Sequence, residues 1–178
     1  DMKIVRPLFL AALCLFFVLP AAAAGPTVAF SPSPLESPAG QTVPLAIRIA
    51  DVQGLYGFEM QLKFDPAVVE VVDADPNAVG VQLLPGDFLA LDMLVRNQAD
   101  NSAGTAEFVL TQINPSEAKS GTGVLLTIYL RGKAAGQGSA VEIVKAQFAT
   151  RDGEAIDVAL GDGVVRVAAA ATPAKSPT

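Results

Sequence analysis

The sequence predicts an all-β protein, either a β-sandwich or a jelly roll, and three observations support this. Short runs of alternating apolar and polar residues recur along the chain, and a period of two is the pattern of a half-buried strand. Turn-forming residues separate these runs at intervals of about ten residues. No long segment shows the 3.6-residue period of an amphipathic helix. Roughly eight or nine short strands with this spacing favour two packed sheets.

The clearest strand is predicted at residues 56–64, because apolar and polar residues alternate strictly there. Its apolar side carries Tyr56, Phe58, Met60, Leu62 and Phe64. Its polar side carries Gly57, Glu59, Gln61 and Lys63. Asp65-Pro66 then turns the chain, since proline fixes φ and has no N–H for a sheet ladder. The β-branched run at 68–72 predicts the next strand.

Other strands are predicted on both sides of this pair from alternation and β-branched content. They are expected at 27–31, 43–49, 89–95, 105–112, 124–131, 140–150 and 164–167. Turns are expected at 51–54 and 97–104, a break in regular structure at 37–40, and a single helical turn at 115–119. No stretch resembles another, so the sequence predicts one domain without internal repeats.

The first 24 residues are predicted to be a secretory signal peptide rather than part of the fold. Lys3 and Arg6 form a basic start, residues 7–19 are apolar, and Ala22-Ala23-Ala24 provides a small-residue cleavage site. The predicted organisation is a signal peptide at 1–24, one β-sandwich domain at 25–168 and a Pro/Thr/Ala-rich, linker-like tail at 169–178. The mature chain is therefore expected to be secreted.

A membrane anchor and a lipoprotein signal at Cys14 are the alternatives to a cleaved signal. Pro20 interrupts the apolar run short of the roughly 20 residues that a spanning helix needs. Leu13 precedes Cys14 where lipoprotein signals carry a small residue. Cleavage after Ala24 is therefore favoured, with no membrane insertion of the mature protein.

Composition excludes several kinds of chemistry. The chain has no histidine, and its one cysteine, Cys14, lies in the predicted signal peptide. The mature domain therefore has no imidazole or thiol catalysis, no disulfide and no thiolate metal site. The net charge of −6 is scattered along the chain, and nucleic acid would require clustered lysine and arginine. We expect no nucleic-acid partner.

The remaining routes to catalysis or metal binding are weak. The neighbours Lys119 and Ser120 form a common pair rather than a nucleophilic site. The carboxylates that could cleave glycosides are Glu59, Glu70 and Glu107, but alternation places Glu59 on a flat strand face. Residues 73–77 have the oxygen spacing of a calcium loop, but its glycine and its closing glutamate are missing. The sequence predicts a polar turn there, no metal or cofactor site, and no enzyme.

The polar side of the strand at 56–64 has two possible functions, carbohydrate binding and protein binding. Flat glycan sites usually need exposed aromatic rings, but the chain has no tryptophan and its tyrosines, Tyr56 and Tyr129, fall in apolar strands. Alternation alone favours an ordinary solvated face for Gly57, Glu59, Gln61 and Lys63. A protein-binding face is the functional alternative.

Several blocks of the sequence resemble the cohesin domain family. The most specific is Gly-Phe-Glu-Met-Gln-Leu-Lys-Phe-Asp-Pro at 57–66, followed by Val-Glu-Val-Val at 69–72. Supporting blocks are Gly86-Asp87-Phe88, Gly-Val-Leu-Leu-Thr-Ile at 123–128 and Gly-Val-Val-Arg-Val at 163–167. The resemblance spans residues 27–167. It implies a nine-stranded jelly-roll sandwich that binds dockerin modules, which in cellulosomes recruits polysaccharide-degrading enzymes to a scaffold.

The resemblance also implies a site and a partner. The family binds through one flat sheet face, which includes the strand matching 56–64, and calcium belongs chiefly to the dockerin. The implied partner-binding residues are Gly57, Glu59, Gln61, Lys63, Glu107 and Thr111. Enzyme-recruiting cohesins carry Asn and Asp where this chain has Gly57 and Glu59, which points to a non-cellulosomal variant. The alternatives are a carbohydrate-binding module of similar fold and a structural subunit of a surface assembly.

Overall fold

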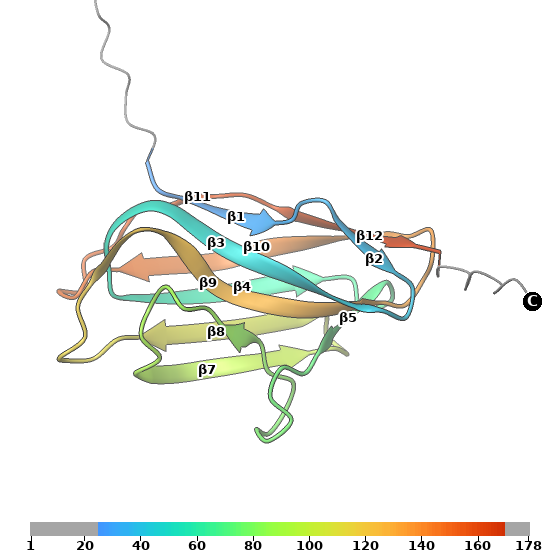
Figure 1. Cartoon of the computed structure of the whole chain (residues 1–178), viewed down its shortest axis with the longest axis horizontal. Coiled ribbons are helices and arrows are strands. Elements are labelled where there is room, and N and C mark those ends of the chain that lie inside the picture. Colours follow the sequence, from blue (N-terminus) through green and yellow to red (C-terminus); the bar gives the residue numbers. More distant parts are fainter. Residues whose placement is uncertain (1–24, 170–178) are drawn as a thin grey trace, which may run out of the picture.

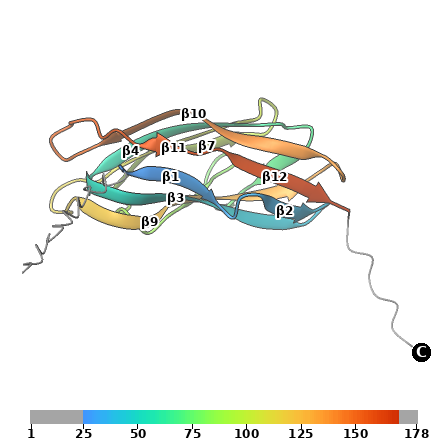
Figure 2. The ribbon, with the colours of Figure 1, turned by 90° about the horizontal axis from the view of Figure 1, so that it is seen from above.

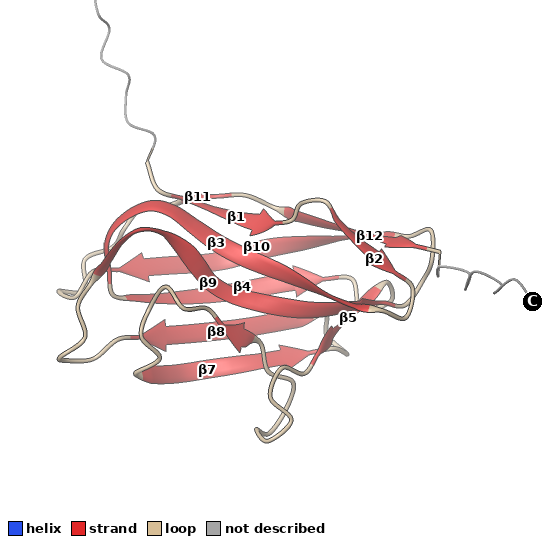
Figure 3. Cartoon of the chain, in the orientation of Figure 1, coloured by secondary structure: helices blue, strands red, loops and turns tan. Residues whose placement is uncertain are grey.

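The computed structural model describes residues 25–169, which form two β-sheets with no helix among them (Figure 1, Figure 3). Sheet A contains β1 (Thr27–Ser31), β3 (Thr42–Leu55), β5 (Val69–Val72), β6 (Leu84–Pro85), β9 (Lys119–Gly132) and β11 (Ala159–Leu160). Sheet B contains β2 (Leu35–Pro38), β4 (Gly57–Phe64), β7 (Met93–Asp100), β8 (Thr105–Thr111), β10 (Gly138–Ala149) and β12 (Gly163–Ala168). The two sheets lie as layers of a sandwich, which Figure 2 shows from above.

The chain passes back and forth between the two sheets, as in a jelly roll. The strand order is β11-β1-β3-β9-β5 in sheet A, with β6 also paired to β9, and β2-β12-β10-β4-β8-β7 in sheet B. Parallel pairs, β1 with β11 and β2 with β12, join the start of the domain to its end. The predicted all-β sandwich is confirmed. Twelve strands are found in residues 25–169, two of them only two residues long, so the expected nine are not reproduced strand for strand.

The core lies between the sheets and is built from the alternating apolar side chains of both. In sheet B, Phe58 of β4 stacks on Phe108 of β8 at 5.5 Å between ring centroids, and on Phe148 of β10 at 6.3 Å. In sheet A, Ile47 and Ile128 are fully buried on the two central strands. Rings on three adjacent strands therefore support sheet B from beneath, which leaves the outward side chains of these strands free of any core role.

The strand predicted at 89–95 is wrong in position, because β7 runs from Met93 to Asp100. The inward side chains of β7 include Asn97, whose amide bonds the backbone of Leu83 through its oxygen (2.8 Å) and its nitrogen (2.8 Å). The Ala99 amide donates to the carbonyl of Val81 at 2.8 Å. This edge strand is thus partly covered by a passing loop and lacks a continuous apolar side. The alternation of apolar and polar residues therefore did not predict its correct position.

The turn predicted at 51–54 is instead the bulged end of β3, which continues to Leu55. Asp51 and Gly54 have positive φ angles of 56° and 67°, and the register to β9 shifts on both sides of Val52. The Gly54 amide donates to the hydroxyl of Ser120 at 2.9 Å. Pairing with β9 therefore keeps this irregular segment in the sheet.

Two further predictions about loops are wrong. Residues 115–119 form no helical turn, and β9 already begins at Lys119. Ser37-Pro38 lies in β2 rather than in a break, because it pairs in parallel with β12. The Ser37 hydroxyl also accepts the Gly132 amide at 3.2 Å, so the short strand is tied to both sheets.

The predicted signal peptide at 1–24 lies outside the described residues, as does the tail from 170 onward. No helix of residues 25–169 is long and apolar enough to cross a membrane.

Candidate functional site

The structure brings all six predicted partner-binding residues onto the outer face of sheet B. β4 and β8 are antiparallel neighbours, with Gly57 opposite Thr111 and Gln61 opposite Glu107. Glu59 and Lys63 alternate with these residues along β4 and point to the same side. The side chains of Phe58 and Phe108 point the other way, into the core. Two strands separated by more than forty residues of sequence therefore contribute to one surface.

Strands β10 and β7 extend this surface on either side, and sequence reasoning did not include them. We call the outer face of β10, β4, β8 and β7 the four-strand face. β10 adds Ala140, Glu142, Lys145, Gln147 and Ala149, and β7 adds Met93, Arg96, Gln98 and Asp100. On β10 these residues alternate with core residues, whereas β7 shows no such alternation at its start; in both strands only the register places them beside β4 and β8.

Two ion pairs cross the four-strand face. The Glu59 carboxylate lies 2.6 Å from the Lys145 ammonium, and the Glu107 carboxylate lies 2.7 Å from the guanidinium of Arg96. All four side chains remain partly exposed, so each pair contributes little to stability. Their main effect is to neutralise the middle of the face. Within residues 25–169, Lys63 is in no ion pair of this kind.

A shallow depression of about 210 Å³ lies around Gly57 at one end of the face. Its outward lining is Gly57, Glu59, Val109, Thr111, Gln147 and Ala149. A Cβ atom at position 57 would lie 2.9 Å from the hydroxyl of Thr111 and 3.1 Å from the carbonyl of Leu110. The absence of a side chain at Gly57 therefore both permits the close approach of Thr111 and leaves the depression open.

The opposite end of the face is polar, and the β7–β8 turn closes around Asp100. Its carboxylate accepts the Ser102 hydroxyl at 2.6 Å and the Ser102 and Ala103 amides at 2.8 and 3.0 Å. These bonds, the Ser102 hydroxyl first, lower the pKa of Asp100 from its ordinary value. Lys63 and Glu142, which pair across β4 and β10, lie in the same row as Asp100.

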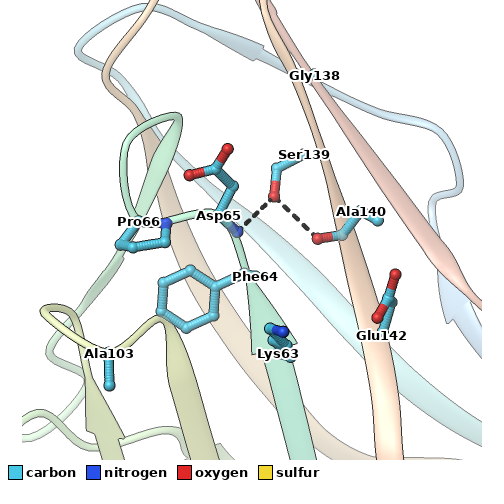
Figure 4. A pocket seen from close by; sticks show the side chains of 9 residues that line it. All are labelled: Lys63, Phe64, Asp65, Pro66, Ala103, Gly138, Ser139, Ala140 and Glu142. Carbon is cyan, nitrogen blue, oxygen red and sulfur yellow. Dashed lines mark hydrogen bonds between the residues drawn. The ribbon is translucent and has the colours of Figure 1, made fainter.

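A larger hollow of about 410 Å³ lies at this polar end, beside the Asp65-Pro66 turn (Figure 4). Its one buried hydroxyl, that of Ser139, accepts the Asp65 amide at 3.0 Å and donates to the Ala140 carbonyl at 2.9 Å. The Asp65 carboxylate accepts the Ala67 amide at 2.9 Å. The Ser139 hydroxyl and the Asp65 carboxylate are both hydrogen-bonded to backbone groups. The hollow therefore holds no serine activated by a base.

The calcium-like segment at 73–77 uses its oxygens within the loop. The Asp73 carboxylate accepts the amides of Asp75 and Gln82, at 3.2 and 2.9 Å, and the Asp75 carboxylate accepts the Asn77 amide at 3.0 Å. Nowhere in residues 25–169 do three or more acidic side chains gather in a way that could hold a metal ion. The segment is a hydrogen-bonded polar turn.

The tyrosines do not form a sugar-stacking platform. Tyr56 is almost fully buried, and the guanidinium of Arg151 lies 5.1 Å from its ring centre. Tyr129 belongs to β9 of sheet A, opposite Pro44 and Val72. Among the described residues, the outer face of sheet B carries no aromatic side chain, since its phenylalanines point into the core.

The model of the cohesin domain family matches residues 28–167, which is nearly the whole described sandwich. The chain belongs to the cohesin family. The resemblance expected from 57–66 and 69–72 is thereby confirmed, and with it the two-sheet fold of this cohesin domain. A search of curated proteins finds no match.

Solved cohesin structures share this fold at low sequence identity. The seventh ScaB type I cohesin from Pseudobacteroides cellulosolvens is 17% identical, with a TM-score of 0.68 over 86% of this chain and 99% of that one. A non-cellulosomal cohesin from the archaeon Archaeoglobus fulgidus is 18% identical, with a TM-score of 0.63 over 81% and 91%. The Coh-OlpA–Doc918 complex is a type I cohesin–dockerin complex from Clostridium thermocellum. It is 13% identical, with a TM-score of 0.65 over 81% of this chain and 99% of that one.

Proposed function

We propose that this cohesin domain is an exported, non-catalytic recognition module that binds dockerin-bearing proteins through its four-strand face. One observation carries the proposal: six residues predicted on two distant strands lie together on the outer face of sheet B, and five of them are at least partly exposed. Family membership supports it, and so do the similar cohesins that were solved in complex with dockerins. The contacts are assigned to Glu59, Gln61 and Lys63, joined by Glu107 and Thr111.

The partner is a dockerin-containing exported protein that brings its own calcium. No cluster of acidic side chains suited to a metal ion is found in residues 25–169, so the calcium dependence of binding is assigned to the partner. Through such a partner, the module is associated indirectly with polysaccharide degradation. Gly57 stands where enzyme-recruiting cohesins carry Asn, and this supports a non-cellulosomal role.

Direct carbohydrate binding is the alternative, and no feature of the described face favours it. Retention of the chain on insoluble cellulose or xylan, but not on an inert support, would replace our proposal with a carbohydrate-binding module. A structural subunit of a surface assembly would bind neither glycan nor dockerin. The two assays therefore separate all three functions.

The test of the proposal is a pull-down against calcium-loaded dockerin modules, repeated with a chelator. We expect calcium-dependent capture that is weakened by Lys63→Glu, because Lys63 is exposed and free of the ion pairs that occupy Glu59 and Glu107. The combined reversal Glu59→Lys and Lys63→Glu should weaken capture further. Arg48→Glu on the exposed side of β3 in sheet A is the matched control. Equal capture by the parent and the face variants would overturn the site assignment.

A further inference from the structure

The four-strand face changes in character from one end to the other. At one end, the row of residues opposite one another across the strands is Ala149, Gly57, Thr111 and Met93. At the other end, the corresponding row is Glu142, Lys63, Thr105 and Asp100. The first row is small and mostly apolar, whereas three of the four residues in the second are ionisable. The face is therefore divided along the strands rather than uniform.

Exposed apolar side chains gather at the Gly57 end. Of the ten exposed large apolar side chains in residues 25–169, five lie in or beside the start of β7 and the end of β8. They are Leu91, Met93, Leu94, Val95 and Ile113. Met93 is 51% exposed and pairs with Thr111, which in turn borders Gly57. Met93 therefore places exposed apolar surface beside the depression on the four-strand face, whereas Leu94 lies opposite the core-facing Leu110.

The charge nearest to the depression is directed away from it. Glu59 borders the depression, but its carboxylate is paired with Lys145 at 2.6 Å. Lys145 lies opposite Gln61, which is one row farther from Gly57. The ion pair therefore draws the carboxylate toward the polar end. Gly57, Val109 and Ala149 contribute the apolar part of the lining, and Thr111 and Gln147 contribute polar side chains to it.

From this geometry we propose that the Gly57 depression is a subsite for a single aliphatic side chain of the partner. The inference rests on the proposed function and names the chemistry of one contact within it. A closed cavity of about 150 Å³ binds benzene, so about 210 Å³ of open depression accommodates a side chain of leucine or isoleucine size. At position 57 recognition is then by shape and apolar contact, without the hydrogen bond that an asparagine would provide.

The depression can be tested without the natural partner, by amide NMR of the ¹⁵N-labelled chain during titration. The probe is isobutanol, which has the leucine side-chain skeleton, and propionamide is the polar control of similar size. We expect saturable shifts of Gly57, Thr111 and Ala149 with isobutanol and none with propionamide. Shifts spread over the whole surface, or equal shifts with both probes, would overturn the proposal.

Ala149→Leu fills the depression from β10, and Ala140→Leu makes the same change at the polar end of that strand. The isobutanol shifts should disappear in Ala149→Leu and persist in Ala140→Leu; persistence in both would contradict the subsite. Gly57→Ala fills the floor directly and serves as a second variant. Thermal unfolding shows that each variant is folded before it is compared.

With any dockerin module that binds the parent chain, Ala149→Leu should bind about 10- to 100-fold more weakly, as expected for losing one buried aliphatic side chain. Ala159→Leu, at an exposed position of β11 in sheet A and outside the four-strand face, should bind like the parent. Equal affinities of the parent and Ala149→Leu would overturn the subsite while leaving the proposed function intact. If no dockerin binds the parent, the proposed function fails, and the isobutanol titration still decides whether the depression takes an aliphatic group.

Discussion

The ring stack beneath the four-strand face gives the most direct quantitative prediction. Phe108 is fully buried on β8, with its ring 5.5 Å from that of Phe58 on β4. Phe→Ala in a core costs about 3–5 kcal/mol through lost burial and the cavity left behind. The stacking of Phe108 on Phe58 contributes about 0.5–1.5 kcal/mol of this loss in stability. Phe108→Ala should therefore lower the free energy of unfolding by about 4 kcal/mol, a large share of the about 5–15 kcal/mol typical of a domain.

The assay is equilibrium unfolding in urea, followed by far-ultraviolet circular dichroism. Thr105→Ala is the matched control, because Thr105 is exposed on the outward side of the same strand, and such substitutions stay within about 0.5 kcal/mol. The double-mutant cycle of Phe58→Ala with Phe108→Ala should give a coupling of about 0.5–1.5 kcal/mol. A loss for Phe108→Ala below about 1.5 kcal/mol, far under the range for a buried ring, would refute the packing described for sheet B.

Three further outcomes follow from the described contacts. Gly86→Ala should destabilise the fold by about 3 kcal/mol in the same urea assay, because its Cβ would lie 2.0 Å from the Val124 carbonyl; a neutral result would contradict the pairing of β6 with β9. A double-mutant cycle for Glu59 and Lys145 should give about 0.5 kcal/mol that vanishes in high salt; a salt-insensitive coupling would contradict an exposed ion pair. The pKa of Asp100 is lowered in the fold by the Ser102 hydroxyl, so its charged form stabilises the fold above the unfolded pKa of about 3.9. That contribution is lost as pH falls through the lower folded pKa, and Asp100→Asn should reduce the fall in thermal midpoint at acidic pH.

Alternation in the sequence was enough to predict the faces of β4 and β8. Side chains of a strand point alternately to opposite sides, so nine alternating residues determine which ones face the core. The pairing of Gly57 with Thr111 could not be predicted this way, because register depends on contacts between residues more than fifty positions apart. The prediction that Glu107 and Thr111 accompany the β4 residues came from the family resemblance, and the structure places them there.

The contributions of β7 and β10 were missed for different physical reasons. Asn97 takes an inward position on β7, where it bonds the passing loop at Leu83, so this strand lacks the apolar side that alternation detects. β10 has a bulge between Ile143 and Lys145, which puts Val144 out of phase and exposes it. The bulge also determines which β10 side chain reaches Glu59. A prediction based on a strict period of two detects neither the inward Asn97 of β7 nor the bulge of β10.

The shape of the face at Gly57 depends on two residues rather than one. An asparagine at position 57 would place its Cβ 2.9 Å from the Thr111 hydroxyl, closer than real Cβ atoms come to their neighbours. Thr111 would have to move before the new side chain could point outward. Gly57 and Thr111 therefore act as a pair, in which a glycine on β4 permits a branched side chain on β8. A change from an apolar depression to a hydrogen-bonding contact at this position therefore requires the Thr111 side chain to shift as well, so the specificity of the face depends on the β4–β8 register.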